Sequence, residues 1–139
     1  MSYEQKGVWT QLLSSAAAYI AYLAIVVPRL FHTPAAHVSY LLPLLVTTLA
    51  SVFIATVVRS ALEVARPSDS GKADVRDRDI ARFGQHASRW CVVGGAIAGF
   101  IGAANHWDYF WIANVIYLGF VLWAVVDSVL RLVAYRRGL

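Results

Sequence analysis

Side chains able to do chemistry are scattered through long apolar stretches of this sequence. On a helical wheel at 100° per residue they gather into stripes, within residues 11–22, 37–51 and 114–128. If these stretches cross a bilayer, the stripes predict a polar interior, because lipid-facing positions do not accept polar groups cheaply. Either these groups only hydrogen-bond across helices, or they line a cavity that opens outward. The cavity interpretation names six candidates: Tyr22, His37, Tyr40, His106, Asn114 and Tyr117.

Charged and imidazole groups at the predicted helix ends raise two further hypotheses. His32, His37, His106 and Asp108 are all expected near one membrane face, and imidazole with carboxylate suits zinc. They come from two separate turns without tight ligand spacing, so we expect no metal site. Asp127 is expected about 27 Å along its helix from Tyr109, near a membrane boundary. Its expected role is a charge pair with Arg131, four residues on, or with Arg59 or Arg89, and a gating or coupling role is the alternative.

Composition defines the elements that must position these groups. The chain has 139 residues, 59% of them hydrophobic and 14% charged, which is too apolar for a soluble domain of this size. Four apolar stretches approach the ~20 residues that a bilayer core requires. They are residues 7–27, 40–58, 88–104 and 109–131, with a polar loop over 59–87. The sequence therefore predicts an all-α fold, in which residues 1–139 form one integral-membrane domain, a four-transmembrane-helix bundle of two helical hairpins.

The third stretch, WCVVGGAIAGFIGAA, is crowded with small residues. Gly95 and Gly99 form a GxxxG pair, and Gly94, Ala98 and Gly102 repeat the four-residue spacing beside it. Helices in lipid associate through close packing, which small residues permit. We therefore expect an oligomer interface at Gly95, Gly99 and Gly102, most simply that of a homodimer. Whether this face packs between chains or within one chain stays open at this stage.

Charge predicts the orientation. Eleven of the twelve Lys and Arg residues fall at the termini, at the predicted ends of the spans beside them or in the middle loop, and only Arg29 falls on the opposite side. By the positive-inside rule, both termini and the loop are expected in the cytoplasm. The segment 66–84 is a solvated connector or a docking site for a soluble partner, with Ile80 and Phe83 free to rest on the membrane surface. The net charge of +4 then reflects an anionic leaflet, and we expect no nucleic-acid partner.

Two segments of the second half carry a resemblance. They are DVRDRDI (Asp74 to Ile80) and HWDYFWIANVIYLGFVLWAVVDSVLRLVAYRRG (His106 to Gly138). Together they resemble a family of small uncharacterised bacterial four-helix membrane proteins, which have an Asp/Arg-rich cytoplasmic loop motif and an Arg-Arg-Gly type ending. Val75 and Arg76 depart from the usual acidic motif. The resemblance implies a multi-pass protein of the bacterial inner (plasma) membrane, and it brings no activity and no functional residues.

Enzyme signatures are absent from the sequence. It has no phosphate-binding glycine loop, HExxH, CxxC, GxSxG or aspartate-rich diphosphate motif, so neither a catalytic residue nor a cofactor can be named. We therefore expect a non-enzymatic, homo-oligomeric regulatory, sensory or accessory subunit. One alternative is a small transporter or ion channel. The other is a membrane-embedded enzyme that acts on an apolar substrate in the outward-facing cavity.

Overall fold

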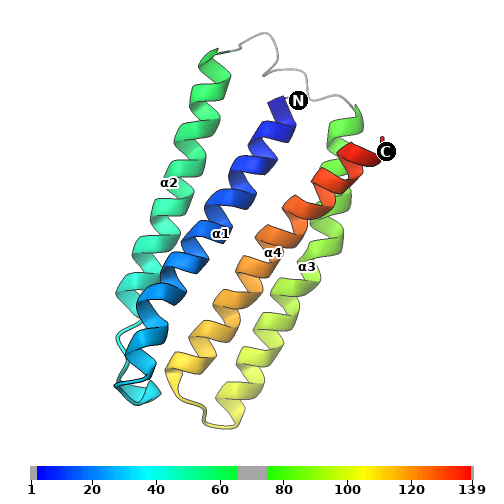
Figure 1. Ribbon diagram of the computed structural model, residues 1–139. Helices are drawn as coiled ribbons and strands as arrows, with labels where there is room; N and C mark the ends of the chain where they lie inside the picture. The colour runs from blue at the N-terminus through cyan, green and yellow to red at the C-terminus, as the bar shows by residue number, and fades with distance from the viewer. Residues whose placement is uncertain (1–2, 66–74, 139) are drawn as a thin grey trace.

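The computed structural model describes residues 3–65 and 75–138, and the ordered elements in these ranges are helices. Four of them are long: α1 (Tyr3–Leu30), α2 (Leu41–Ala65), α3 (Val75–Ala104) and α4 (Tyr109–Arg137). A short 3-10 turn, η1 (Ala35–His37), lies between α1 and α2. The long helices run side by side as a four-helix bundle (Figure 1), and each is long and apolar enough to cross a membrane.

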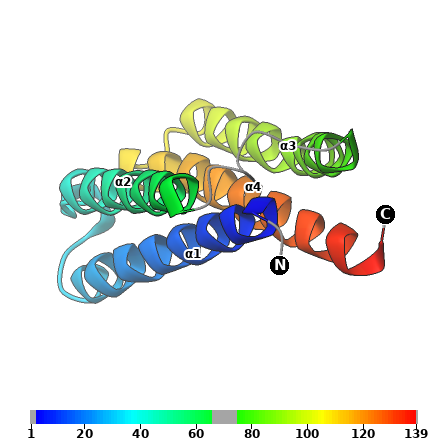
Figure 2. The ribbon, with the colours of Figure 1, turned by 90° about the horizontal axis from the view of Figure 1, so that it is seen from above.

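Neighbours in the bundle follow the order of the chain only in part. α1 packs against α2, α3 packs against α4, and α1 also packs against α4, so that α4 lies between α1 and α3 (Figure 2). Tyr3 and Arg137 lie at one end of the bundle, which we call the terminal end (Figure 1). The opposite end, which we call the turn end, holds the connections 31–40 and 105–108.

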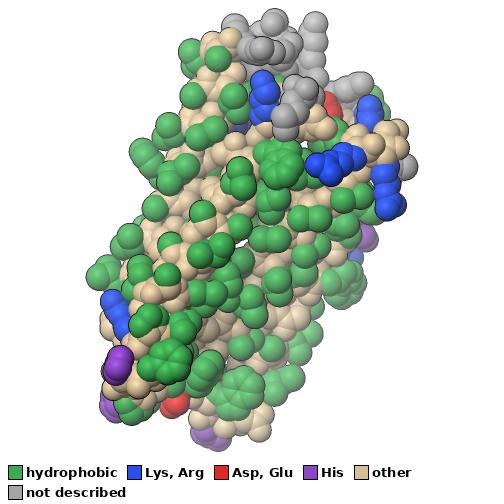
Figure 3. All heavy atoms as spheres, in the orientation of Figure 1, with side chains coloured by type: hydrophobic (Ala, Val, Ile, Leu, Met, Phe, Trp, Pro, Cys, Tyr) green, Lys and Arg blue, Asp and Glu red, His purple; other side chains and the backbone are tan. Residues whose placement is uncertain are grey.

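Side-chain types divide the surface as expected for a protein in a bilayer. In Figure 3, hydrophobic side chains cover the visible flanks of the helices, while Lys and Arg gather mainly at the terminal end. α2 is the most exposed helix, and its only buried residue is Pro43. In water such apolar exposure would be costly, whereas in lipid it is the ordinary state of a spanning helix. The surface therefore supports the assignment of this chain as a multi-pass membrane protein.

The helices contain the four predicted spans but extend beyond them. α3 begins at Val75 and runs without interruption to Ala104, so the described part of the segment 66–84 belongs to the same helix as the third span. The loop predicted over 59–87 is correspondingly helical at both sides, to Ala65 and from Val75. A count of apolar residues detects only the part of a helix that lies in the hydrocarbon core. The backbone hydrogen bonds of the helix continue into its polar ends, so the helix is longer than the apolar stretch.

The turn between α3 and α4 is built by a left-handed residue. His106 has φ 57°, an uncommon value for a residue with a side chain. Its N–H donates to the carbonyl of Ala103, and the N–H of Trp107 donates to that of Gly102, the two bonds of a Schellman motif. The Trp107 ring then rests on Gly102, where an added Cβ would lie 2.7 Å from the ring. His106 therefore serves the turn, and Gly102 makes room for an indole.

The glycine face of α3 is covered by α4 of the same chain. A Cβ on Gly95 would lie 2.8 Å from the Cα of Gly119, and one on Gly99 would lie 2.6 Å from the side chain of Ile116. Both contacts require a residue without a side chain. The oligomer interface expected at Gly95, Gly99 and Gly102 thus needs a correction, because the packing within one chain already occupies this face.

Candidate functional site

A cluster of aromatic and amide side chains joins α1 to α4. Tyr22 is fully buried, and its hydroxyl donates to Oδ1 of Asn114 at 2.6 Å. The Asn114 Nδ2 donates to the carbonyl of Phe110 at 2.8 Å, which fixes the orientation of the amide. The Tyr117 ring meets that of Tyr22 edge to face, with centroids 5.2 Å apart. Tyr40 packs against the same core, so four of the six cavity candidates are together, but they fill the space between the helices.

Most of the smaller hydroxyls bond to their own helix. Ser88 donates to Gly84, Ser128 donates to Ala124, and the Thr47 hydroxyl donates to Pro43, each to the carbonyl four residues back. This local bond satisfies a hydroxyl without a partner helix. The polar stripes in the sequence therefore overstate how much polar contact crosses the bundle.

Another part of the stripes lines a groove, which we call the hydroxyl groove. It has a volume of about 200 Å³ and lies between α2 and α4, with α1 contributing Ser15 and Ala18. α2 contributes Thr48, Ser51 and Val52, and α4 contributes Tyr117, Phe120, Val121, Trp123 and Ala124. The wall is thus mostly apolar and aromatic, with four hydroxyls set into it.

Only two of the four hydroxyls in the groove, those of Thr48 and Tyr117, form a hydrogen bond with each other. Thr48 Oγ1 lies 3.3 Å from the Tyr117 hydroxyl, a long bond between α2 and α4. The hydroxyls of Ser15 and Ser51 bond to no other residue in the part of the chain that the structure describes. Both residues are half-buried, and both face the groove. The hydroxyl groove therefore offers unsatisfied donors beside aromatic rings.

The depth of the groove restricts what can reach it. At 1.5 Å per residue, Ser51 lies about 15 Å from the start of α2, and Ser15 lies about 18 Å from the start of α1. A bilayer core is about 30 Å thick. Because α1 and α2 run in opposite directions, these distances are counted from opposite ends of the bundle. Both serines therefore belong to the central part of a membrane span, where lipid head groups do not reach.

The histidines at the turn end stay outside this cluster. His37 and His106 are both exposed, and Tyr40 is half-buried against the Phe110 ring, with centroids 5.5 Å apart. The cavity of six residues is therefore corrected: His37 and His106 lie on separate turns at the surface. The positions of these turns depend on how the helices end. The helical periodicity of the spans does not indicate this, so it could not predict where the histidines lie.

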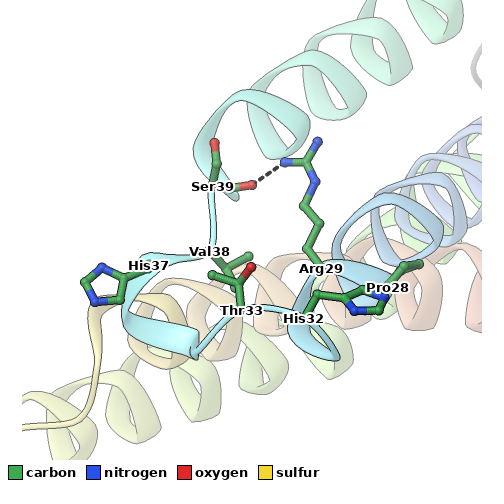
Figure 4. A pocket seen from close by; sticks show the side chains of 7 residues that line it. All are labelled: Pro28, Arg29, His32, Thr33, His37, Val38 and Ser39. Atoms are coloured by element: carbon green, nitrogen blue, oxygen red, sulfur yellow. Dashed lines mark hydrogen bonds between the residues drawn. The ribbon is translucent and has the colours of Figure 1, made fainter.

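A pocket of about 490 Å³ occurs beside the first of these turns (Figure 4). In this pocket, Arg29 Nη1 donates a hydrogen bond to the carbonyl of Ser39 at 2.6 Å. The bond links the end of α1 to the residues just before α2. His32 and His37 lie on opposite sides of the pocket and do not converge (Figure 4). Among the described residues no group of three His, Cys, Asp or Glu is placed to hold a metal ion.

The predicted charge pair is present and is buried between α3 and α4. Arg131 Nη2 lies 2.8 Å from Asp127 Oδ2, and Nε donates to Oδ1 at 3.0 Å, so the contact is bidentate. Asp127 is 1% exposed. The pair packs on Gly84 of α3, where a Cβ would lie 2.6 Å from the Asp127 carboxylate. The sequence predicted the pair, but not that a glycine of the neighbouring helix makes room for it.

Comparisons with known proteins add no identity to this geometry. No family model, no curated protein and no solved structure matches the chain.

Proposed function

We propose that this chain is a non-enzymatic sensory or regulatory subunit of the bacterial inner membrane, and that its input is a small neutral lipophile bound in the hydroxyl groove. One observation carries the proposal. The hydroxyls of Ser15 and Ser51, without partners among the described residues, face a groove at the depth of the acyl chains. A hydroxyl facing lipid gains no hydrogen bond there, so an occupant with a polar atom fits the groove better than an acyl chain.

Depth and lining together define the class of ligand. Phospholipid head groups do not reach the middle of the bilayer, so the polar atom must belong to a molecule that is neutral and mostly apolar. Serine and tyrosine hydroxyls can donate to a carbonyl oxygen, and Phe120 and Trp123 offer aromatic faces. A planar carbonyl compound with an apolar tail, such as an alkylated quinone, meets these requirements.

Two alternative functions have weaker support. A proton-coupled transporter calls for a carboxylate in the translocation path, whereas Asp127 is neutralised by a bidentate Arg131. An enzyme with an outward-facing site calls for convergent acid and base groups, whereas His37 and His106 lie on separate exposed turns. The positive-inside pattern supports cytoplasmic termini for the proposed subunit.

Fluorescence of Trp123 tests the proposal directly. The protein in lipid nanodiscs is titrated with decyl-benzoquinone, a quencher with a planar carbonyl head and an apolar tail. We expect saturable quenching that Trp123→Phe removes, because Trp123 lines the groove. Ser51→Phe fills the groove and should weaken binding at least tenfold. The matched control is Ala50→Phe, which adds the same ring at an exposed neighbouring position of α2.

Two results would count against this proposal. Quenching that does not saturate, or that is equal in Ser51→Phe and Ala50→Phe, reports partition into the bilayer and overturns the ligand site. A second copy is the other occupant to test, since a homodimer was the expected assembly. Ser51→Cys in a Cys91→Ser background should not cross-link in nanodiscs, and an efficient disulfide-linked dimer would assign the groove to a second copy.

A further inference from the structure

The terminal end of the α3–α4 hairpin has a second pocket, which is independent of the hydroxyl groove. Its volume is about 500 Å³. Ile80 and Ala134 are buried at 4% and 2% exposure and form its floor. Phe83 and Val75 are exposed at its rim, at 52% and 68%. The sequence had placed Ile80 on the membrane surface, and the structure turns it inward.

The pocket lies at the depth of lipid head groups. Counting about 20 residues back from Ala104, the length of a bilayer core, places the boundary near residue 85 of α3. Counting the same length forward from Tyr109 places it near residue 129 of α4. Ile80, Phe83 and Ala134 therefore lie at the boundary between the hydrocarbon core and the head groups. An apolar pocket at this level is in contact with the upper part of acyl chains and with the glycerol region.

Positive charge surrounds the pocket. Seven arginines and three aspartates fall within residues 75–90 and 127–137. Asp127 is already neutralised by Arg131, and Asp77 accepts a hydrogen bond from Tyr135 at 2.9 Å. The remaining aspartate, Asp79, lines the pocket together with Arg76. The net charge of this end is therefore positive, and the pocket itself contains both a cation and an acceptor.

Helix geometry brings one more arginine to the rim. Arg137 follows Ala134 by three residues, so it lies about 60° away around α4 and one turn nearer the end. Arg136 follows Ala134 by two residues and lies about 160° away, on the other side of the helix. Both side chains are exposed and have no ion pair with a described residue. Arg137 can therefore reach an anion above the pocket, and Arg136 cannot.

We infer that this pocket binds one anionic phospholipid with a hydroxyl-bearing head group, of the phosphatidylglycerol type. The phosphate lies beside Arg137 at the mouth of the pocket, because arginine presents several donors to phosphate oxygens. A head-group hydroxyl donates to Asp79, and the upper acyl chain lies along Phe83 and Ile80. Basic pockets between spanning helices at the membrane boundary bind anionic head groups by the same chemistry.

Native mass spectrometry of protein released from mixed nanodiscs tests this inference. Nanodiscs contain equal amounts of phosphatidylglycerol and phosphatidylcholine, and the measured quantity is the ratio of the two lipids retained on the protein. We expect phosphatidylglycerol to be preferred by the unmodified chain. Arg137→Gln should lower that preference about fivefold, the effect of one arginine near the surface. Arg136→Gln removes the same charge on the other side of the helix and should leave the preference unchanged.

A second pair of variants tests the apolar wall. Phe83→Ala should lower the number of phosphatidylglycerol molecules retained, because the acyl chain loses its contact. Phe100→Ala is the matched control, since Phe100 is another exposed ring of α3, at 77%. Equal losses in Arg136→Gln and Arg137→Gln would mean diffuse attraction of the terminal end and would overturn the site. So would an unmodified chain without preference between the two lipids.

Discussion

The two hairpins of this bundle are held together by different means. α3 and α4 touch through their backbones where Gly95 meets Gly119, and they bury the Asp127–Arg131 ion pair between them. Between the described residues of α1 and α2 neither a glycine contact nor a buried ion pair occurs; Tyr3 donates to Glu63 at 2.8 Å at the exposed surface, and α2 buries only Pro43. Helices in lipid gain little from apolar burial, so close backbone approach and polar bonds decide how tightly they associate. The α3–α4 hairpin is therefore the firm half of the molecule and the α1–α2 hairpin the open half.

The location of the two candidate sites follows from this difference. The hydroxyl groove lies between α2, the most exposed helix, and α4, and Ser51 faces it. The pocket that we propose for an anionic lipid lies on the firm hairpin, at the membrane boundary.

The largest effect should come from removing one partner of the buried ion pair. Arg131→Met leaves Asp127 buried at 1% exposure without its cation, which should cost about 3 kcal/mol in the free energy of unfolding. The measurement is unfolding in mixed micelles followed by circular dichroism. Asp127→Leu combined with Arg131→Met should recover much of the loss, since an apolar pair needs no compensation. A single variant as stable as the unmodified chain would mean that water reaches Asp127.

The next effect tests the backbone contact of the firm hairpin. A methyl group on Gly95 would lie 2.8 Å from the Cα of Gly119, so Gly95→Ala must push the helices apart and should cost about 2 kcal/mol. Gly94 has nothing within 4 Å of the same position. Gly94→Ala is therefore the matched control and should be neutral or slightly stabilising. Equal shifts of the thermal midpoint in both variants would contradict the close α3–α4 contact.

A smaller effect is expected at the contact between the two hairpins. Tyr22→Phe removes the 2.6 Å bond to Asn114 and leaves the amide oxygen without a donor. Polar contacts between membrane helices contribute on the order of 1 kcal/mol, so we expect a loss of that size. A double-mutant cycle with Asn114→Leu measures the interaction, and a coupling energy near zero would mean that the ring contacts alone hold α1 to α4.

The spans and the charge pair could be predicted from the sequence because both depend on local spacing. Four apolar stretches of bilayer length give four helices, and a residue four positions after Asp127 is its neighbour on the helix surface. The spacing of residues does not indicate which helix packs against each helix face. The pattern of Gly95 and Gly99 predicts close packing against some helix, and only the fold identifies that helix as α4.

The sequence predicted a polar site between the helices, but it did not predict which residues line that site. Ser15, Thr48 and Ser51 fall within the polar stripes over 11–22 and 37–51, and all three line the groove. The aromatic wall, with Phe120 and Trp123, carries no signal in a sequence that is apolar throughout. The expectation that His37 and His106 line the cavity extends the helical periodicity into the turns. The left-handed residue at 106 and the short η1 turn aim these side chains elsewhere.

The smallest effect on stability is expected at Ser51. Its comparison with the effect at Ser88 distinguishes the packing of the two hairpins most clearly. Its hydroxyl bonds to no described residue, so Ser51→Val should change the free energy of unfolding by less than about 0.5 kcal/mol. Ser88→Val, on the firm hairpin, removes a hydroxyl of a fully buried residue that donates to Gly84 at 2.7 Å, and it should cost clearly more because the larger side chain meets packed neighbours. Measured side by side in the same micelles, comparable losses at both positions would mean that α2 is packed as firmly as α3 and that the groove is closed. A loss at Ser88 alone would leave Ser51 as a residue whose hydroxyl is available for binding rather than for folding.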